Sequence, residues 1–143
     1  MLLELVALLA AGLFAGAATY VTLVEHPARV SAGAGVALAE FRPSYARAAI
    51  MQASLAVLGG VAGIGRWWVG GSVGWLVGGL VLGAVVPFTL IAIMPTNARL
   101  LDASHRFEDA EALALLRHWS RLHAVRALAG LFAFALFSAL AVR

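Results

Sequence analysis

The chain contains no cysteine and no lysine, and few charged residues of either sign. Without cysteine it can form no disulfide, no thiolate nucleophile and no Cys-ligated metal site. Charged residues make up 12% of its 143 residues, against roughly 25% in soluble domains. Its ten basic residues are all arginines, and they are too sparse for the basic face of a nucleic-acid-binding protein.

Apolar residues dominate instead, at 63% of the chain with a mean hydropathy of +0.96, which excludes a disordered chain. Four runs lack any charge: 5–24, 48–65, 67–98 and 127–142. A helix needs about 20 apolar residues to cross the hydrocarbon core of a bilayer. A cleaved signal peptide is the alternative for the first run, but no basic residue precedes it. We predict an all-α integral membrane four-helix bundle, one transmembrane domain (1–143) with spans at about 3–24, 46–65, 73–94 and 125–142.

The arginines are distributed unequally between the two ends that four spans would create. Two long connecting segments, 25–47 and 95–126, carry eight of the ten arginines. The other end carries only Arg66 and Arg143. By the positive-inside rule we expect both segments to be amphipathic cytoplasmic loops, with both termini outside the cell (inner) membrane.

Glycine and tryptophan residues predict how the helices pack and where they meet the membrane surface. Small residues four apart let transmembrane helices approach closely, so we expect a tight bundle, and the same faces would permit a homo-oligomer. The GxxxG pairs are Gly12/Gly16, Gly59/Gly63, Gly74/Gly78 and Gly79/Gly83. Tryptophan favours membrane interfaces, so we expect an outer belt made of Trp67, Trp68 and Trp75.

The first and third spans end in similar proline motifs, which suggests a weak internal repeat. The first span runs into His26-Pro-Ala-Arg29, and the third into Pro95-Thr-Asn-Ala-Arg99. In the segments that follow, Phe41 aligns with Trp119. Such a repeat would relate two helix pairs of the same orientation, but chance similarity explains the motifs equally well.

The first span carries a stripe of small and polar residues that ends in a histidine. His26 falls on the helical face that also holds Gly12, Gly16 and Thr19. It would therefore face the bundle, although a histidine at the lipid headgroups, hydrogen-bonded to water, explains the position equally well. Pro27 follows, and we expect the first helix to end there.

The third span ends in a polar turn, Pro95-Thr96-Asn97. One interpretation is that Pro95 ends the helix and that Thr96 and Asn97 cap the segment that follows. The other is that these two residues supply a hydroxyl and an amide to a cavity at membrane depth. Pro87, earlier in the same span, should kink the helix and open space beside it.

The segment before the fourth span has the periodicity of an amphipathic helix, but its apolar side includes ionisable residues. Trp119, His123 and Arg126 share that side with several leucines. A buried histidine or arginine is costly in a membrane unless it has a partner or lines a cavity. Either these residues pair with Glu25 or Glu40, or they form a polar site.

Metal binding is only weakly indicated. His118 and His123 are five residues apart, so they lie on different faces of a helix and cannot chelate one ion. His26 and His123 could hold a copper ion or a haem between two helices, as helix bundles do. Nothing in the sequence requires a cofactor. A haem- or copper-binding membrane redox module is therefore one alternative function.

Three motifs occur together in this chain: His26-Pro-Ala-Arg29, Pro87-Phe-Thr89 with Met94-Pro-Thr-Asn97, and Trp119-x-x-x-His123-x-x-Arg126. This combination resembles the anthrone oxygenase-like family of small four-helix membrane proteins, and the resemblance covers nearly the whole chain. Named fungal members are implicated in oxidising anthrones to anthraquinones. The resemblance therefore implies a membrane oxidoreductase that acts with O₂ on a lipophilic phenolic or quinone-like substrate. A non-catalytic small membrane partner protein is the other alternative.

The resemblance also implies roles for particular side chains. An anthrone CH₂ group is acidic because its carbanion is an extended phenolate. Histidine, whose unperturbed pKa is about 6.5, suits its deprotonation, and His123 or His26 would be that base. Arg126 and Asn97 would stabilise the oxyanion in a dry cavity, and the anion would react with O₂ directly or by way of a bound metal. The other expected substrate contacts are Thr96, Trp119, Tyr45 and Tyr20.

Overall fold

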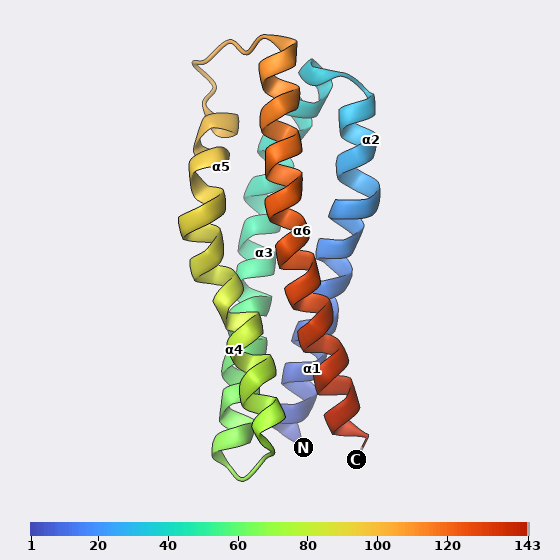
Figure 1. The fold of residues 1–143 in the computed structure, drawn as a ribbon, viewed down its shortest axis with the longest axis vertical. Helices are drawn as coiled ribbons and strands as arrows, with labels where there is room; N and C mark the ends of the chain where they lie inside the picture. The colour runs from blue at the N-terminus through green and yellow to red at the C-terminus, as the bar shows by residue number, and fades with distance from the viewer. Residues whose placement is uncertain (143) are drawn as a thin grey trace.

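The structure is a computed structural model that describes residues 1–142, and these form four long helical spans. The spans are Leu2–Ser31, Ala34–Trp68, Val73–Leu101 and Asp109–Ala141, each 29–35 residues long and apolar enough to cross a membrane. Each span runs antiparallel to the next, so both termini and the 69–72 turn lie at one end (Figure 1). The chain is thus an all-α, multi-pass membrane protein, as expected. Arg143, which we expected at the outer end, lies outside the described residues.

Two of the four spans contain a short π-helical segment. The first span consists of α1 (Leu2–Tyr20), η1 (Val21–Glu25) and α2 (His26–Ser31). The third consists of α4 (Val73–Phe88), η2 (Thr89–Ile93) and α5 (Met94–Leu101). The second and fourth spans are the continuous helices α3 (Ala34–Trp68) and α6 (Asp109–Ala141).

The two segments expected as cytoplasmic loops are mostly helical extensions of the bundle, which corrects the prediction. Neither Pro27 nor Pro95 ends its span, because each lies in the first turn of the helix that follows a π segment. In a regular α-helix the proline ring clashes with the carbonyl four residues earlier, and the wider π turn relieves that clash. Thr96 and Asn97 accordingly lie inside α5 and cap no helix.

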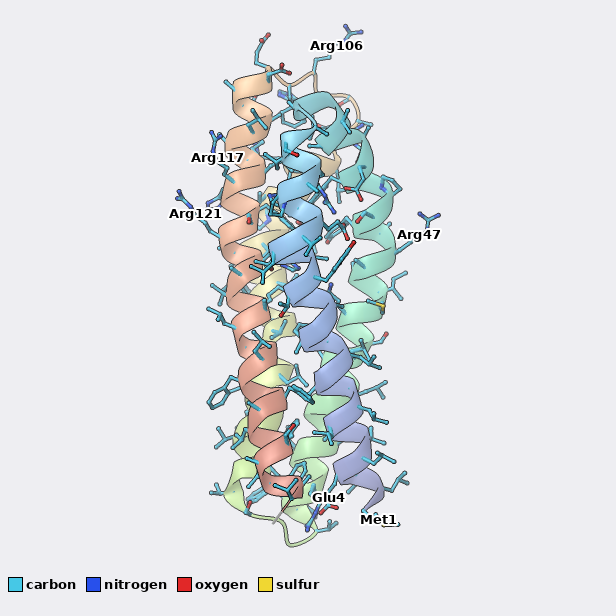
Figure 2. The ribbon with its side chains drawn as sticks, turned by 90° about the vertical axis from the view of Figure 1, so that its right-hand side faces the viewer. Met1, Glu4, Arg47, Arg106, Arg117 and Arg121 are labelled. Atoms are coloured by element: carbon cyan, nitrogen blue, oxygen red, sulfur yellow. The ribbon has the colours of Figure 1, made fainter. Side chains whose placement is uncertain are left out.

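The bundle is longer than a bilayer is thick, and its two ends differ in charge. At 1.5 Å per residue the spans measure about 44–53 Å, whereas the hydrocarbon core measures about 30 Å. Figure 2 shows four arginines projecting from the half of the bundle that lies away from the termini: Arg47, Arg106, Arg117 and Arg121. The large exposed apolar side chains of the first, third and fourth spans end on that side at Val24, Met94 and Val125. The belt that lipid would surround therefore ends at this level.

Glycine allows the second and third spans to touch through their backbones. A Cβ atom added to Gly79 would lie 2.8 Å from the carbonyl oxygen of Gly60, so neither position has room for a larger residue. Gly16 and Gly83, in contrast, face open space. Most of the glycines expected at helix contacts are therefore used inside one bundle, and α3 contacts both α1 and α4 while α6 closes the ring.

Trp75 is not part of an outer belt, contrary to the prediction. Its ring is buried and stacks on Phe137, with the ring centroids 5.1 Å apart. Gly78 has no side chain, and a Cβ atom there would lie 2.4 Å from the Phe137 ring, so glycine leaves the space that this stack needs. Trp68 is exposed and Trp67 is half-buried at the same end of the bundle.

The π segments favour a true internal repeat over chance similarity. Each is five residues long, and each begins six residues before its proline, Pro27 or Pro95. Phe41 and Trp119, which the alignment pairs, meet edge to face with their centroids 5.2 Å apart. Since π-helices are rare, the same placement in both halves is unexpected for unrelated segments.

Candidate functional site

Buried polar side chains gather at the level where the apolar belt ends. Within residues 1–142 the buried polar or charged side chains are His26, Arg29, Gln52, Thr96, Asn97, His123 and Arg126. They come from all four spans, on α2, α3, α5 and α6. Such groups are tolerated at membrane depth only where they pair with one another or line a cavity. This layer is therefore the candidate functional site.

His123 is held by a hydroxyl group of the π segment η1. Its Nδ1 lies 3.0 Å from Oγ1 of Thr22, and the Thr22 hydroxyl donates its single proton to the carbonyl of Ala18 at 2.8 Å. Thr22 can therefore only accept from the imidazole, which assigns the proton of the neutral ring to Nδ1. The ring also stacks on Trp119, 4.7 Å away between centroids. His123 is thus fixed in one orientation with an unprotonated Nε2.

A chain of hydrogen bonds links Trp119, Asn97 and Tyr45. The indole N–H of Trp119 donates to Oδ1 of Asn97 at 2.9 Å, and Nδ2 of Asn97 donates to the hydroxyl oxygen of Tyr45 at 3.0 Å. Each donation fixes the direction of the next, so the Tyr45 oxygen is an acceptor toward Asn97. The hydroxyl proton of Tyr45 therefore points elsewhere and can be donated to a ligand.

Arg126 is a buried cation whose only hydrogen-bonded partner within residues 1–142 is neutral. It donates from Nη2 to Oε1 of Gln52 at 2.9 Å, and its guanidinium lies 5.8 Å from the ring centroid of Phe14. Its Nε is buried and has no hydrogen-bond partner in the described chain. Gln52 accepts through its oxygen, and its side chain lines the cavities beside Arg126. A buried cation without a counter-charge is costly, and an anion bound beside it would offset that cost.

The carboxylates that might have neutralised this site bind a different arginine. Glu25 forms an ion pair with Arg29, and Nε of Arg29 lies 2.6 Å from Oε2 of Glu40. Ser44 donates to Glu25 at 3.0 Å and completes the group. The expected alternative, in which Glu25 or Glu40 pairs with His123 or Arg126, is therefore wrong. Glu25 pairs with Arg29 and not with His123 or Arg126, because Arg29 lies four residues away in the same span.

Two adjoining cavities give access to these groups. One, of about 30 Å³, lies between the first span, α3 and α6, where His123, Trp119 and Arg126 line it. The other, of about 130 Å³, lies between α3 and the α4–η2 segment. Both cavities are lined by Tyr45, Ala49, Gln52 and Arg126. A ligand in the larger cavity would therefore meet the donors of Arg126, Tyr45 and Gln52 and no carboxylate.

The structure brings most of the expected site residues together, but not all of them. His123, Arg126, Asn97, Trp119 and Tyr45 form one connected group, and the ring of His26 lies 5.1 Å from that of Trp119. Thr96 is buried but lines neither of the two cavities. Tyr20 is 55% exposed on α1 and lines neither cavity, so the structure does not bring it together with the other expected site residues.

Two residues of the site were missed from the sequence, Gln52 and Thr22. Gln52 is a polar side chain in an otherwise apolar, uncharged run, which could have marked it as functional. Thr22 lies three residues after Thr19 and four before His26, on the same face of a regular helix, so extending the stripe that ends in His26 could have found it.

The two buried histidines do not by themselves make up the ligand set of a zinc or copper ion. Both His26 and His123 pack against the indole of Trp119, at 5.1 and 4.7 Å between centroids. Across residues 1–142, no three His, Cys, Asp or Glu side chains come close enough together to hold a metal ion. Two imidazoles without further ligands are fewer than protein zinc or copper sites use. His118 is exposed on α6.

A family model described as anthrone oxygenase matches residues 41–136, which is more than half of the chain. The matched region contains Tyr45, Gln52, Asn97, Trp119, His123 and Arg126 but not the His26 motif. No curated protein and no solved structure matches the chain. Sequence and architecture agree, and this four-helix membrane protein belongs to the anthrone oxygenase family.

Proposed function

We propose that this protein is a membrane oxidoreductase that oxidises a lipophilic, anthrone-type phenolic substrate with O₂. The observation that carries the proposal is that His123, with its free Nε2, and Arg126, with no carboxylate partner in the described chain, line one cavity. A base beside an uncompensated cation suits a substrate that loses a proton and becomes an anion. Membership of the family supports an anthrone as that substrate.

The first step is deprotonation. Nε2 of His123 takes a proton from the CH₂ group of the anthrone, and the negative charge moves onto the ring oxygen. Arg126, Gln52 and Tyr45 line both the smaller cavity, which His123 also lines, and the larger one, so they can donate to that oxygen from where the two cavities adjoin. Donors that are fixed before the charge develops stabilise it without reorganising, which is the usual source of large rate effects.

Oxidation then requires O₂ as the only co-reactant. The carbanion forms a C–O bond with O₂, and the peroxide anion takes back the proton that His123 holds, which gives a hydroperoxide. Loss of water from this hydroperoxide leaves the second carbonyl of the quinone. The balance is CH₂ + O₂ → C=O + H₂O, so no reductant is consumed and His123 returns to its starting state.

The test is turnover of an anthrone by the purified protein in lipid nanodiscs, measured by O₂ uptake and by the absorbance of the quinone. We expect His123→Gln to lower kcat by about 10²–10⁴-fold, which is the usual contribution of a general base. His118→Gln is the matched control, because His118 is exposed on the same helix, and it should leave kcat unchanged. Equal turnover by both variants, or no turnover by the unmodified protein, would contradict the proposal.

A further inference from the structure

The larger cavity has the volume of a single aromatic ring. It measures about 130 Å³ and is bounded by small residues of α3 on one side and by α4–η2 on the other. An apolar cavity of about 150 Å³ in a protein interior is known to hold one benzene molecule. A fused three-ring molecule cannot be enclosed in this space, so any larger ligand must extend beyond it.

The open side of this cavity faces the lipid. Ala53, Leu90 and Met94 line it and are exposed on the apolar belt. Its inner end is formed by buried Gln52 and Arg126. A molecule dissolved in the bilayer can therefore enter sideways between α3 and η2 with its polar end first.

The chemistry at the inner end selects for an acidic oxygen. Arg126 supplies a positive charge, and Tyr45 and Gln52 supply further donors, while no carboxylate lines this cavity. A phenolic oxygen that carries full or partial negative charge can accept from all three groups. An ether or a hydrocarbon in the same place would leave the buried guanidinium unpaired.

We infer that the cleft between α3 and η2 is a lateral binding site for amphipathic phenols in general: one hydroxylated ring is enclosed, and the remaining rings or an alkyl tail stay in the lipid. This inference rests on the proposed function only because both place a ligand oxygen beside Arg126, Tyr45 and Gln52. It extends the substrate class from three-ring anthrones to single-ring phenols with a lipophilic tail. Ala53, at the mouth of the cleft, is the residue that sets the size of the entering ring.

A second groove provides a matched control. It lies between α4 and α6, has a volume of about 280 Å³ and also reaches Arg126. Its lining is apolar apart from that arginine, and it includes the lipid-exposed Ala84. It offers neither Tyr45 nor Gln52, so a phenol should not prefer it.

The experiment measures equilibrium binding to the protein in phosphatidylcholine nanodiscs by quenching of tryptophan fluorescence. The probes are 4-dodecylphenol, its methyl ether and a monohydroxylated anthraquinone. We expect the alkylphenol and the hydroxyanthraquinone to compete for one site, and the methyl ether to bind at least tenfold more weakly. Ala53→Phe should weaken binding of the phenol at least tenfold, and Ala84→Phe should leave it within twofold.

Equal affinity for the phenol and its ether, or equal effects of the two substitutions, would overturn the inference. So would binding of the hydroxyanthraquinone without competition from the alkylphenol. The thermal unfolding midpoint of each variant checks that the bundle is intact, which is expected because Ala53 and Ala84 both face lipid. Binding is measured without turnover, so a site that binds phenols but oxidises none would contradict the proposed function while leaving this inference standing.

Discussion

Two threonines about one turn apart in the first span, Thr19 and Thr22, differ in their hydrogen bonds, and that of Thr22 sets the protonated nitrogen of His123. Thr22 accepts from Nδ1 of His123, and that contact decides which imidazole nitrogen is free. Thr19 has a buried hydroxyl oxygen with no partner in the described chain. The two side chains have the same chemistry, but only Thr22, on the π segment, contacts His123 of α6.

At the scale of single residues, we predict that the two Thr→Val substitutions change the free energy of unfolding differently. Thr22→Val leaves the N–H of His123 without an acceptor and should lower the free energy of unfolding by about 1–3 kcal/mol. Thr19→Val removes a hydroxyl that makes no bond and should be neutral or slightly stabilising. Denaturant titration in detergent micelles measures both. If the two variants were equally stable, the hydrogen bond between Thr22 and His123 would contribute nothing.

The helices themselves follow from composition, but their irregularities do not. Apolar runs long enough to span a bilayer predict four helices, and the prolines suggest where two of them might end. The chain instead passes Pro27 and Pro95 by means of η1 and η2. Whether a proline ends a helix or follows a π turn depends on the neighbouring helices, because these hold the turns after the proline in place. The local sequence around a proline does not show which helices will pack against it.

At the scale of helix packing, the glycines of α4 provide a matched pair for a prediction. Gly79→Ala places a Cβ atom 2.8 Å from backbone atoms of α3, whereas Gly83→Ala meets nothing within 4 Å. We expect the first substitution to lower the free energy of unfolding by about 1–3 kcal/mol, because overpacking forces the helices apart. The second should be neutral or stabilising, since alanine favours helix more than glycine does. Thermal unfolding in detergent would compare them, and a similar loss in both would exclude a close α3–α4 crossing.

At the scale of the whole molecule, Arg47, Arg106, Arg117 and Arg121 project from the half of the bundle that lies away from Met1 (Figure 2). This asymmetry predicts that the arginine-rich end is cytoplasmic. The site lies at the boundary between that end and the apolar belt, so a lipid-soluble ligand would meet it near the inner membrane surface.

Orientation can be tested directly because the chain has no cysteine. We expect a membrane-impermeant maleimide to label Ser72→Cys, in the turn near the termini, on intact spheroplasts. Arg106→Cys, in the 102–108 connection, should react only after the membrane is permeabilised. The reverse pattern would show that the termini are cytoplasmic and that the arginine count misassigns the topology.

Sequence alone determined the class of this protein, the number of its spans and the side of the last helix on which His123 and Arg126 lie. These properties depend on apolar run length and on a regular 100° periodicity, both of which are local. Only the tertiary structure decided that Arg29 takes Glu25 and Glu40, that Gln52 accompanies Arg126 and that Tyr20 faces outward. Those outcomes depend on contacts between residues far apart in the chain, and on π turns that rotate one part of a helix against another.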